Sequence, residues 1–403
     1  MTRSVWLDED NAPRPGLEGK RTADAVILGA GMTGIGLAHF LAERGVAALV
    51  VERDVVAGGA TGRNLGLLVS GLGEHYACSI EFWGRQQAAA ITRLNLQNHA
   101  LVSELVDRFE IDCGYRRAGS LTAGIHAAEE EDLRRSCRLM QEDGFTCTFL
   151  EAEEMNRALG ARGFLGGVYT PGDGVVNSVQ LVRRLARVVE NAGAGIVERT
   201  PVRRMARAGA DWVVEAAGGS VTTPLLFLAC NAWLPLLCGH LPLRPVRGQC
   251  CAFAAPESSL PEMACLSNYG AEYWRRAGGY CLFGGFRRFG GAGEESDSDR
   301  VTENVQSALV EFVHGYFPLL QAAPVTHRWS GIMAYTPDGL PLVGRVNGEK
   351  DLYAAAGYTG HGYGSAFLAA RWLAELALEG KDEIPAICRI DRPMRPSPSL
   401  QES

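Results

Sequence analysis

The chain has 403 residues, a length that allows two or three domains with a large buried core. Hydrophobic residues make up 47% and charged residues 21% of it, which is typical of folded chains rather than extended disordered ones. Lys and Arg number 39 against 46 Asp and Glu, so the net charge of −7 gives no general attraction to nucleic acid or to an anionic membrane. We therefore expect neither as a partner. The sequence carries no signal for an oligomeric state.

The eleven cysteines show no C-x-x-C spacing and no pattern typical of a disulfide framework. Reduced thiols are typical of the cytosol, and residues 1–20 are polar without an apolar signal-peptide core, so we expect a cytoplasmic protein. The most apolar stretch, residues 225–243, is interrupted by Asn231, Pro235 and His240. This favours a buried strand followed by a new element over a membrane span.

A strand–helix–strand pattern opens the folded part of the chain. Residues 24–29 are a short apolar run, a helical stretch ends at Gly45, and a second apolar run ends at Glu52. Later segments predict helices at 79–110, 127–143, 177–192, 301–315 and 364–379, and strands at 116–123, 194–200, 211–216, 221–229, 247–254, 279–286 and 351–356. We expect the Gly-rich acidic segment 290–300 to be a mobile loop. NLQNH at 95–99 and the acidic residues 127–132 are expected to be solvated helix faces.

The motif GAGMTG occupies residues 29–34, between the first strand and its helix. Gly29 permits a tight turn, Gly31 lets a pyrophosphate approach the backbone, and Gly34 lets the helix pack closely on the strand. The N–H groups at the helix N-terminus favour phosphate, and Glu52 ends the next strand where it is placed to bind ribose hydroxyls. The combination predicts a dinucleotide-binding site.

A second small-residue turn, GGATGRNLGLL at 58–68, follows closely. A nicotinamide-binding domain does not need such a turn, whereas a longer dinucleotide that runs deep into the protein does. We expect Thr61 and Arg63 to hold phosphate or ribitol oxygens. Asn64 and Gly66 are expected to let the chain pass beside an isoalloxazine ring. A plain β-turn is the alternative.

A third glycine cluster lies near the C-terminus and comprises Gly357, Gly360, Gly362 and Gly364. Such a strand-to-helix turn directs N–H groups at a flavin pyrimidine ring, where they stabilise negative charge. His361 lies in this turn, either as a catalytic residue or as a packed histidine. Asp338, in the turn TPDGLP at 336–341, is interpreted as structural. The histidines show no metal-ligand spacing and no G-x-S-x-G motif occurs, so we expect no metal site and no serine nucleophile.

GAGMTG, VERD, GATGRNLG, RWSGIMAYTPDGLPLVG and AAAGYTGHGYG together resemble the FAD-dependent D-amino-acid oxidase/glycine oxidase (DAO) superfamily over residues 5–390. Within it the chain is most similar to the gamma-glutamylputrescine oxidase-like branch. The resemblance implies a two-domain α/β protein with a Rossmann-type FAD-binding domain and an antiparallel-sheet substrate domain. The expected division assigns residues 1–100, 160–240 and 330–390 to the FAD-binding domain, 101–159 and 241–329 to the substrate domain, and 391–403 to a loose tail.

The resemblance also implies a reaction: a small amine or amino acid passes hydride from its α-carbon to flavin N5, and the imine is then hydrolysed or cyclised. Together with the motifs it predicts FAD contacts from Gly29, Gly31, Met32, Thr33, Gly34, Glu52, Arg53, Thr61, Arg63, Asn64, Gly66, Leu67, Val202, Asn231, Ala232, Gly331, Met333, Gly357, Tyr358, Gly360, His361, Gly362 and Tyr363. The candidate catalytic residues are His361, Tyr269 and Arg288. Tyr269, Tyr273, Trp274, Tyr280 and Phe283 form either an aromatic wall for an amine or ordinary sheet core.

Three positions depart from the family pattern. Met333 stands where glycine-oxidase-like members carry a carboxylate-binding Arg, and Gly364 stands where sarcosine-oxidase-like members carry a Lys. A desolvated carboxylate needs cationic partners, so these departures favour an amine substrate unless Arg247, Arg275, Arg287 or Arg288 substitutes. Gly331 stands where sarcosine-oxidase-like members carry the flavin-linking Cys. We therefore expect FAD to be bound non-covalently.

The electron acceptor stays open between oxygen and another acceptor. Oxygen reduction is helped by a positive charge near the flavin, and no Lys occurs between Lys20 and Lys350. Arg287, Arg288 or a protonated His is the possible replacement. Two further alternatives remain: a flavin-dependent tailoring dehydrogenase of a biosynthetic pathway, and a flavin-binding protein without turnover.

Overall fold

The computed structural model describes residues 4–7, 12–254, 260–346 and 349–396. One part is built on a six-stranded sheet in the order β19-β20-β13-β2-β3-β9, in which β19 is antiparallel to β20 and the other neighbours are parallel. Its strands are β2 (Ala25–Leu28), β3 (Ala48–Val51), β9 (Gly195–Val197), β13 (Leu225–Leu228), β19 (Leu342–Arg345) and β20 (Leu352–Ala356).

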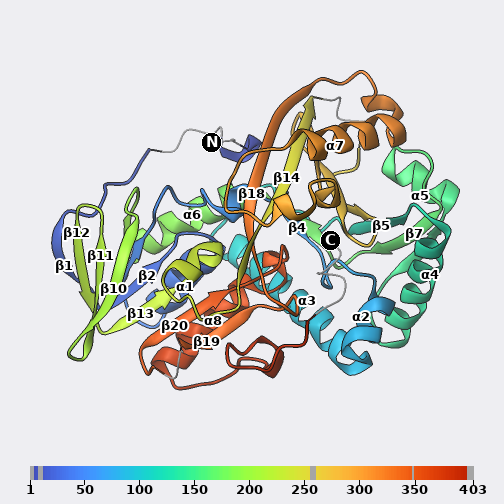
Figure 1. Cartoon of the computed structure of the whole chain (residues 1–403). Helices are drawn as coiled ribbons and strands as arrows, with labels where there is room; N and C mark the ends of the chain where they lie inside the picture. The colour runs from blue at the N-terminus through green and yellow to red at the C-terminus, as the bar shows by residue number, and fades with distance from the viewer. Residues whose placement is uncertain (1–3, 8–11, 255–259, 347–348, 397–403) are drawn as a thin grey trace.

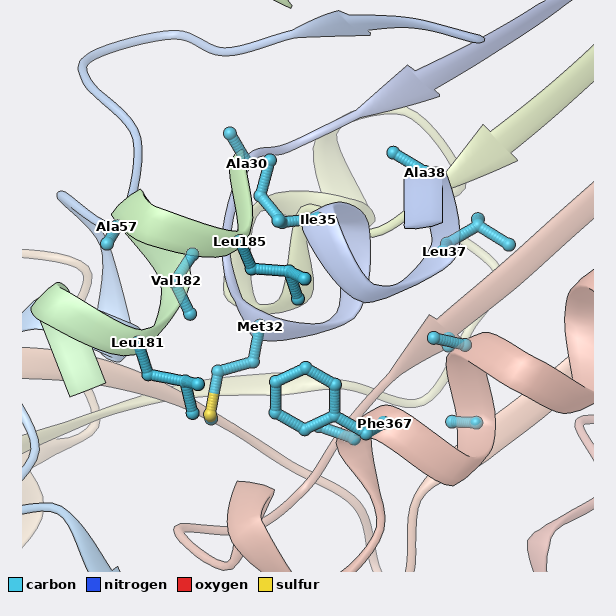
Figure 2. Close-up of a cluster of buried hydrophobic side chains, with 14 of the residues drawn as sticks. Ala30, Met32, Ile35, Leu37, Ala38, Ala57, Leu181, Val182, Leu185 and Phe367 are labelled. Atoms are coloured by element: carbon cyan, nitrogen blue, oxygen red, sulfur yellow. The ribbon is translucent and has the colours of Figure 1, made fainter. Parts of the chain in front are cut away.

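The strand β2 is buried along its whole length, as its uninterrupted apolar sequence predicts for a central parallel strand. Ala25 and Ile27 face a layer of three helices, α1 (Met32–Ala42), α6 (Ser178–Asn191) and α8 (Ala366–Leu378). Figure 2 shows the core of this layer, where Ala30, Met32 and Ile35 meet Leu181 and Leu185 of α6 and Phe367 of α8. Val26 and Leu28 face the opposite core, toward a four-stranded sheet.

This four-stranded sheet has the order β1-β12-β11-β10 and lies at one end of the molecule (Figure 1). Its strands are β1 (Gly19–Thr22), β10 (Val202–Ala208), β11 (Asp211–Ala216) and β12 (Gly219–Thr223). The expected single strand at 221–229 is therefore wrong: β12 and β13 belong to different sheets. Pro224 separates them, because it supplies no N–H to continue either ladder.

The other part is an eight-stranded sheet in the order β18-β14-β17-β16-β15-β5-β7-β6. Its strands are β5 (Ser120–Gly124), β6 (Thr148–Glu151), β7 (Gly166–Thr170), β14 (Arg244–Ala254), β15 (Ala264–Ser267), β16 (Glu272–Ala277), β17 (Tyr280–Gly284) and β18 (Val325–Tyr335). The expected division at 160 places β7 outside this sheet, whereas β7 pairs with β5 and β6 inside it. β18 likewise runs through the expected boundary at 330.

Opposite faces of this sheet enter different cores. Cys250 and Leu282 join the core that contains α1, α6 and α8, whereas Cys251 and Phe283 pack against α7 (Glu303–Tyr316). Further helices on this half are α4 (Ala127–Glu142) and α5 (Ala152–Leu159). The expected helix 79–110 is two helices, α2 (Tyr76–Trp83) and α3 (Arg85–Arg108), broken at Gly84, whose φ is +80°. Along the described ranges, no helix is long and apolar enough to cross a membrane.

Two segments expected to be loose are held by buried ion pairs. The segment 290–300 contains a short helical turn (Gly291–Glu294) whose Glu294 carboxylate is buried and binds Arg247 at 2.7 and 2.9 Å. In the described part of the tail, Arg392 is buried and binds both carboxylate oxygens of Asp338 at 2.7 and 2.9 Å. The tail and loop expectations are therefore wrong at these positions, and Asp338 has the structural partner that its interpretation requires.

Candidate active site

The glycine motif forms a tight strand–turn–helix junction. Gly29 has a φ of +105°, and a β-carbon there would lie 2.7 Å from the carbonyl oxygen of Ala229. A β-carbon at Gly34 would collide with the carbonyl oxygen of Gly29. Gly31 is the N-cap of α1 and provides no side-chain acceptor, so the N–H groups that follow Met32 in the first turn have no capping side chain, as phosphate binding at a helix N-terminus requires.

Glu52 lies directly after β3 beside this turn. Its buried carboxylate accepts N–H bonds from Ala30 at 2.7 Å and from Asp54 at 2.8 Å, and burial raises its pKa. The N–H of Thr200 donates to the Glu52 carbonyl, which brings the start of β10, including Val202, to the same end of the sheet. The Arg53 guanidinium lies 3.9 Å from the ring centroid of Trp233.

The second turn is bonded to the first one. The Thr61 hydroxyl accepts the N–H of Met32 at 3.1 Å, so the two small-residue turns meet at the N-terminus of α1. Arg63 is half-buried, donates to the carbonyl of Ser330 at 2.8 Å, and packs on Gly331, where a β-carbon would lie 2.9 Å from Arg63 Cβ. The turn therefore connects the six-stranded half to β18.

The chain after Arg63 is held in a bent path. Asn64 Oδ1 accepts the N–H of Gly66 at 2.8 Å. Gly66 has a φ of +68°, and a β-carbon there would collide with the carbonyl oxygen of Val176. Leu67 begins β4 (Leu67–Leu68), which pairs with β8 (Gly174–Val175).

The N-terminal residues brace this path, although no motif in the polar segment 1–20 predicts this contact. Trp6 is buried and donates its indole N–H to the Asn64 carbonyl at 2.7 Å, and the Ser4 hydroxyl donates to the Gly62 carbonyl. Arg275 donates to the carbonyls of Leu65, Gly66 and Val176 at 3.0 to 3.2 Å. Burial lowers the pKa of Arg275 to about 10.

Replacing Trp6 by Phe is expected to weaken binding of FAD, the cofactor that the sequence predicts, up to about tenfold, because it removes one hydrogen bond that holds the Asn64 turn. The dissociation constant is measured by titrating apoprotein with FAD. Trp212→Phe is the matched control, since its buried indole N–H has no hydrogen-bond partner in the described part of the chain. Equal effects of the two changes would contradict a role for Trp6 in the site.

The third turn meets the first across the molecule. The hydroxyls of Tyr358 and Thr33 share a hydrogen bond of 2.7 Å. A β-carbon at Gly362 would lie 3.0 Å from Met32 Cε. Asn231, with a φ of +43°, accepts the N–H of Gly357 at 3.0 Å and is followed by the buried Ala232.

Two buried asparagines of α3 hold the other end of the third turn. Asn95 donates to the carbonyl of Gly364 at 2.9 Å, and Asn98 donates to that of Tyr363 at 2.7 Å. The expectation that residues 95–99 form a solvated helix face is wrong, because both amides are buried against this turn. A substitution at Gly364 would also meet Asn95, whose Nδ2 would lie 2.6 Å from a β-carbon there.

His361 is packed within the third turn. Its Nδ1 lies 2.9 Å from the carbonyl of Thr359 and donates to it, and its Nε2 faces Gly73. Burial, with a contribution from the nearby charge of Arg287, lowers the pKa of His361. The imidazole is therefore neutral at neutral pH.

The sheet face turned toward these glycines carries Tyr273, Met333 and Tyr335. A β-carbon at Gly248 would lie 3.0 Å from Met333 Cε and 3.8 Å from the Tyr273 hydroxyl, and one at Gly360 would lie 3.4 Å from Met333 Sδ. Met333 thus reaches from β18 to the third turn. Arg287 donates to the Tyr335 hydroxyl, and its guanidinium lies 4.9 Å from the Tyr335 ring centroid.

The other candidates lie elsewhere. Arg288 binds the buried carboxylate of Glu272. Glu272 is two residues before Trp274 on β16, so the two side chains point to the same face of the sheet. Trp274 and Phe283 pack in the core under α7, so they do not belong to a wall on the face of Tyr273. Tyr280 packs on the core that contains α1, α6 and α8. Tyr269 is 38% exposed and donates to Asp132 at 2.9 Å.

Among the residues that the structure describes, no group of three His, Cys, Asp or Glu gathers as a metal site.

Three turns that meet around one helix N-terminus, with a buried acid beside them, define the site of a dinucleotide-binding flavoprotein. The glycines let the turns approach one another where β-carbons would clash, and Glu52, Thr61 and the α1 N–H groups match the ribose and pyrophosphate of FAD. The residues present therefore fit this cofactor.

A family model described as FAD dependent oxidoreductase (DAO) matches residues 24–376, and the chain belongs to this family. It is 27% identical over 393 residues to a probable oxidoreductase OrdL of Rhizobium meliloti (strain 1021), covering 95% of this chain and 89% of that protein. It is 26% identical over 380 residues to gamma-glutamylputrescine oxidoreductase of Escherichia coli (strain K12), covering 91% and 86%. The crystal structure of glycine oxidase from Geobacillus kaustophilus matches with a TM-score of 0.80 and 24% identity, covering 93% of this chain and all of that one.

These findings confirm the resemblance, the fold class and FAD as the cofactor. The protein is an FAD-dependent oxidoreductase of the amine and amino-acid oxidase type, an enzyme that acts on CH–NH groups. The placement of individual FAD contacts stays a prediction.

Proposed function

We propose that this protein oxidises the C–N bond of a small amine or amino acid to an imine, which is then hydrolysed or cyclised. The observation that carries the proposal is the sheet face with Tyr273 and Met333, which is turned toward the three glycine turns and reaches Gly360. The relatives support the substrate class, since one is named for gamma-glutamylputrescine and another for glycine.

In this proposal, bound FAD supplies the hydride acceptor. The protein positions the α-carbon of a neutral amine and excludes water from it. The N–H groups of the 357–364 turn, apart from those of Gly357, Thr359, His361 and Gly364 that donate to protein acceptors, stabilise the charge that develops on reduction. Because Nδ1 of His361 donates to Thr359 and its Nε2 packs against Gly73, His361 holds the turn rather than taking the substrate proton.

We further propose that Arg287 and Tyr335 bind a polar or anionic end of the substrate. Of the four arginines that could replace the missing family anchors, Arg247 binds Glu294, Arg275 binds backbone carbonyls, and Arg288 binds Glu272. Arg287 lies at the end of the sheet face that carries Met333 and Tyr335. This location supports it over its neighbour Arg288.

Product analysis tests the proposed reaction. Incubation with a substrate is expected to yield one carbonyl product and one equivalent of ammonia or released amine for each pair of electrons transferred. A cyclic imine in place of the carbonyl is the outcome expected for the cyclising variant. Formation of neither would contradict C–N oxidation.

FAD is proposed to be non-covalent, since Gly331 packs on Arg63 at the position where a linking Cys is expected in relatives. Denaturation in acid is expected to release the yellow colour into the supernatant. Colour that remains on the precipitated polypeptide would contradict this prediction.

The acceptor is proposed to be oxygen or another small oxidant, and one observation favours keeping the second candidate. All three lysines of the chain, Lys20, Lys350 and Lys381, are exposed rather than placed at the site. Mixing photoreduced protein with air-saturated buffer distinguishes the two. Fast reoxidation with peroxide release indicates an oxidase, and reoxidation as slow as that of free flavin indicates another acceptor.

A cytoplasmic location is also proposed, supported by eleven free cysteines.

A further inference from the structure

Residues 70–75, here called the strap, connect β4 to α2. Two backbone hydrogen bonds hold the start of the strap, one to Asp173 and one to Asn95 of α3. The N–H of Ser70 donates to Asp173 at 3.0 Å, and the N–H of Gly71 donates to Asn95 at 2.7 Å. Asn95 is the residue that also donates to the carbonyl of Gly364. The strap therefore begins against the third glycine turn.

The middle of the strap lies between the His361 turn on one side and Gly270 on the other. Gly73 has a φ of +85°, and a β-carbon there would lie 2.6 Å from Nε2 of His361. On its other side, a β-carbon at Gly270 would collide with the carbonyl of Gly73. The backbone of Gly73 therefore packs directly against the His361 imidazole, with no space for a side chain between them.

The end of the strap is fixed by a buried histidine. His75 is 4% exposed, its Nε2 lies 3.3 Å from Oε1 of Glu129, and its ring lies 4.5 Å from that of Tyr269. Glu129 is completely buried and accepts the N–H groups of Ile125 and Tyr269, each at 2.8 Å. The expectation that residues 127–132 form a solvated face is therefore wrong at Glu129.

The charge state of Glu129 agrees with this anchoring role. Burial acts to raise the pKa of Glu129, but the adjacent His75 ring and the hydrogen bonds from the two backbone N–H groups bring it below its ordinary value. A buried carboxylate with two backbone donors and an imidazole 3.3 Å away is strongly fixed in place, and removing the imidazole takes away the polar side chain nearest to it.

We infer that the strap holds the His361 turn in place and shields the flavin from solvent, and that His75 and Glu129 are positioning residues for this site. The inference rests on the proposed placement of FAD beside the 357–364 turn. Gly71 and Gly73, both at positive φ, are the points where the strap bends. Neither His75 nor Glu129 is expected to touch the substrate.

Gly73→Ala and Gly45→Ala form a matched pair for the test. Both glycines have a φ near +80°, so alanine strains the backbone similarly, but Gly45 lies outside the strap and a β-carbon there meets nothing within 4 Å, whereas one at Gly73 meets His361. The readout is quenching of the fluorescence of bound FAD by iodide, which needs no substrate. We expect a several-fold larger quenching constant and a shifted visible flavin spectrum for Gly73→Ala, and wild-type values for Gly45→Ala. Equal behaviour of the pair would overturn the inference.

His75→Gln and His39→Gln provide a second comparison. His39 is also 4% exposed and lies 3.5 Å from Glu43, at the far end of α1. We expect only His75→Gln to raise iodide quenching and to speed amide exchange of residues 70–75, with unchanged FAD occupancy. Amide exchange is measurable on apoprotein as well. Unchanged quenching and exchange in His75→Gln would overturn the inference even if amines are oxidised, whereas a quenching response without any amine oxidation would count against the proposed reaction alone.

Discussion

Replacing Gly34 by Ala is expected to yield protein that binds FAD at least about a hundredfold more weakly, since overpacking of this kind costs about 3 kcal/mol or more. The β-carbon would collide with the carbonyl oxygen of Gly29, so α1 could not keep its distance from β2. Moving α1 away displaces the N–H groups that are expected to bind the pyrophosphate. FAD titration of apoprotein measures the loss.

Gly45→Ala is the control for this change. Gly45 follows the same helix with a φ of +80°, and a β-carbon there meets nothing within 4 Å. It is expected to lower stability by about 1 kcal/mol and to leave the FAD affinity unchanged. Full FAD retention by Gly34→Ala would contradict the assignment of this turn to the pyrophosphate.

Arg287→Met is expected to lower kcat/KM by about 30- to 150-fold for a substrate with an anionic end, because it removes a charge-assisted hydrogen bond of about 2 to 3 kcal/mol. For an amine without such a group the loss is expected to be small. Steady-state kinetics with a matched pair of substrates, one carrying a carboxylate and one carrying its amide, measures the difference.

Arg288→Met separates this role from a general effect of losing a cation. Arg288 binds the buried Glu272, whose pKa burial raises to about 7, so the variant is expected to lose stability while kcat/KM stays near wild type. A selective kinetic loss in Arg288→Met, with no loss in Arg287→Met, would contradict the assignment and favour the candidate that the sequence suggested.

The parts of the fold that the sequence predicted well are determined by residues close to one another in the chain. The β2–α1–β3 unit, the helix α4 and the three glycine turns follow from local apolar runs, helix ends and glycines at spacings that a strand-to-helix junction requires. Glu52 is similar, because its place at the end of a strand fixes its position beside the first turn.

One group of errors concerns polar residues whose partners are distant in the chain. Asn95, Asn98 and Glu129 look like solvated helix positions, but their partners lie at residues 363–368 and 269. Glu294 and Arg392 lie in segments with loop-like composition and are fixed by Arg247 and Asp338. No local pattern contains that information.

The aromatic wall is a different case, because the sequence held a usable signal. Neighbouring strand residues point to opposite faces, so Tyr273 and Trp274 could not both line one wall. The structure places Tyr273 against Gly248 and Gly284 and Trp274 in the core under α7.

Anaerobic absorbance spectroscopy with a panel of small substrates tests C–N oxidation most directly. The panel contains primary and N-alkylated amines, diamines, and amino acids with free and amidated carboxylates, and each is mixed with FAD-loaded protein. We predict that at least one of them bleaches the visible flavin band within the mixing experiment. The amount of carbonyl product is then expected to equal the amount of flavin reduced. A flavin that dithionite reduces readily but that no member of the panel bleaches would contradict the assignment of this site to amine oxidation.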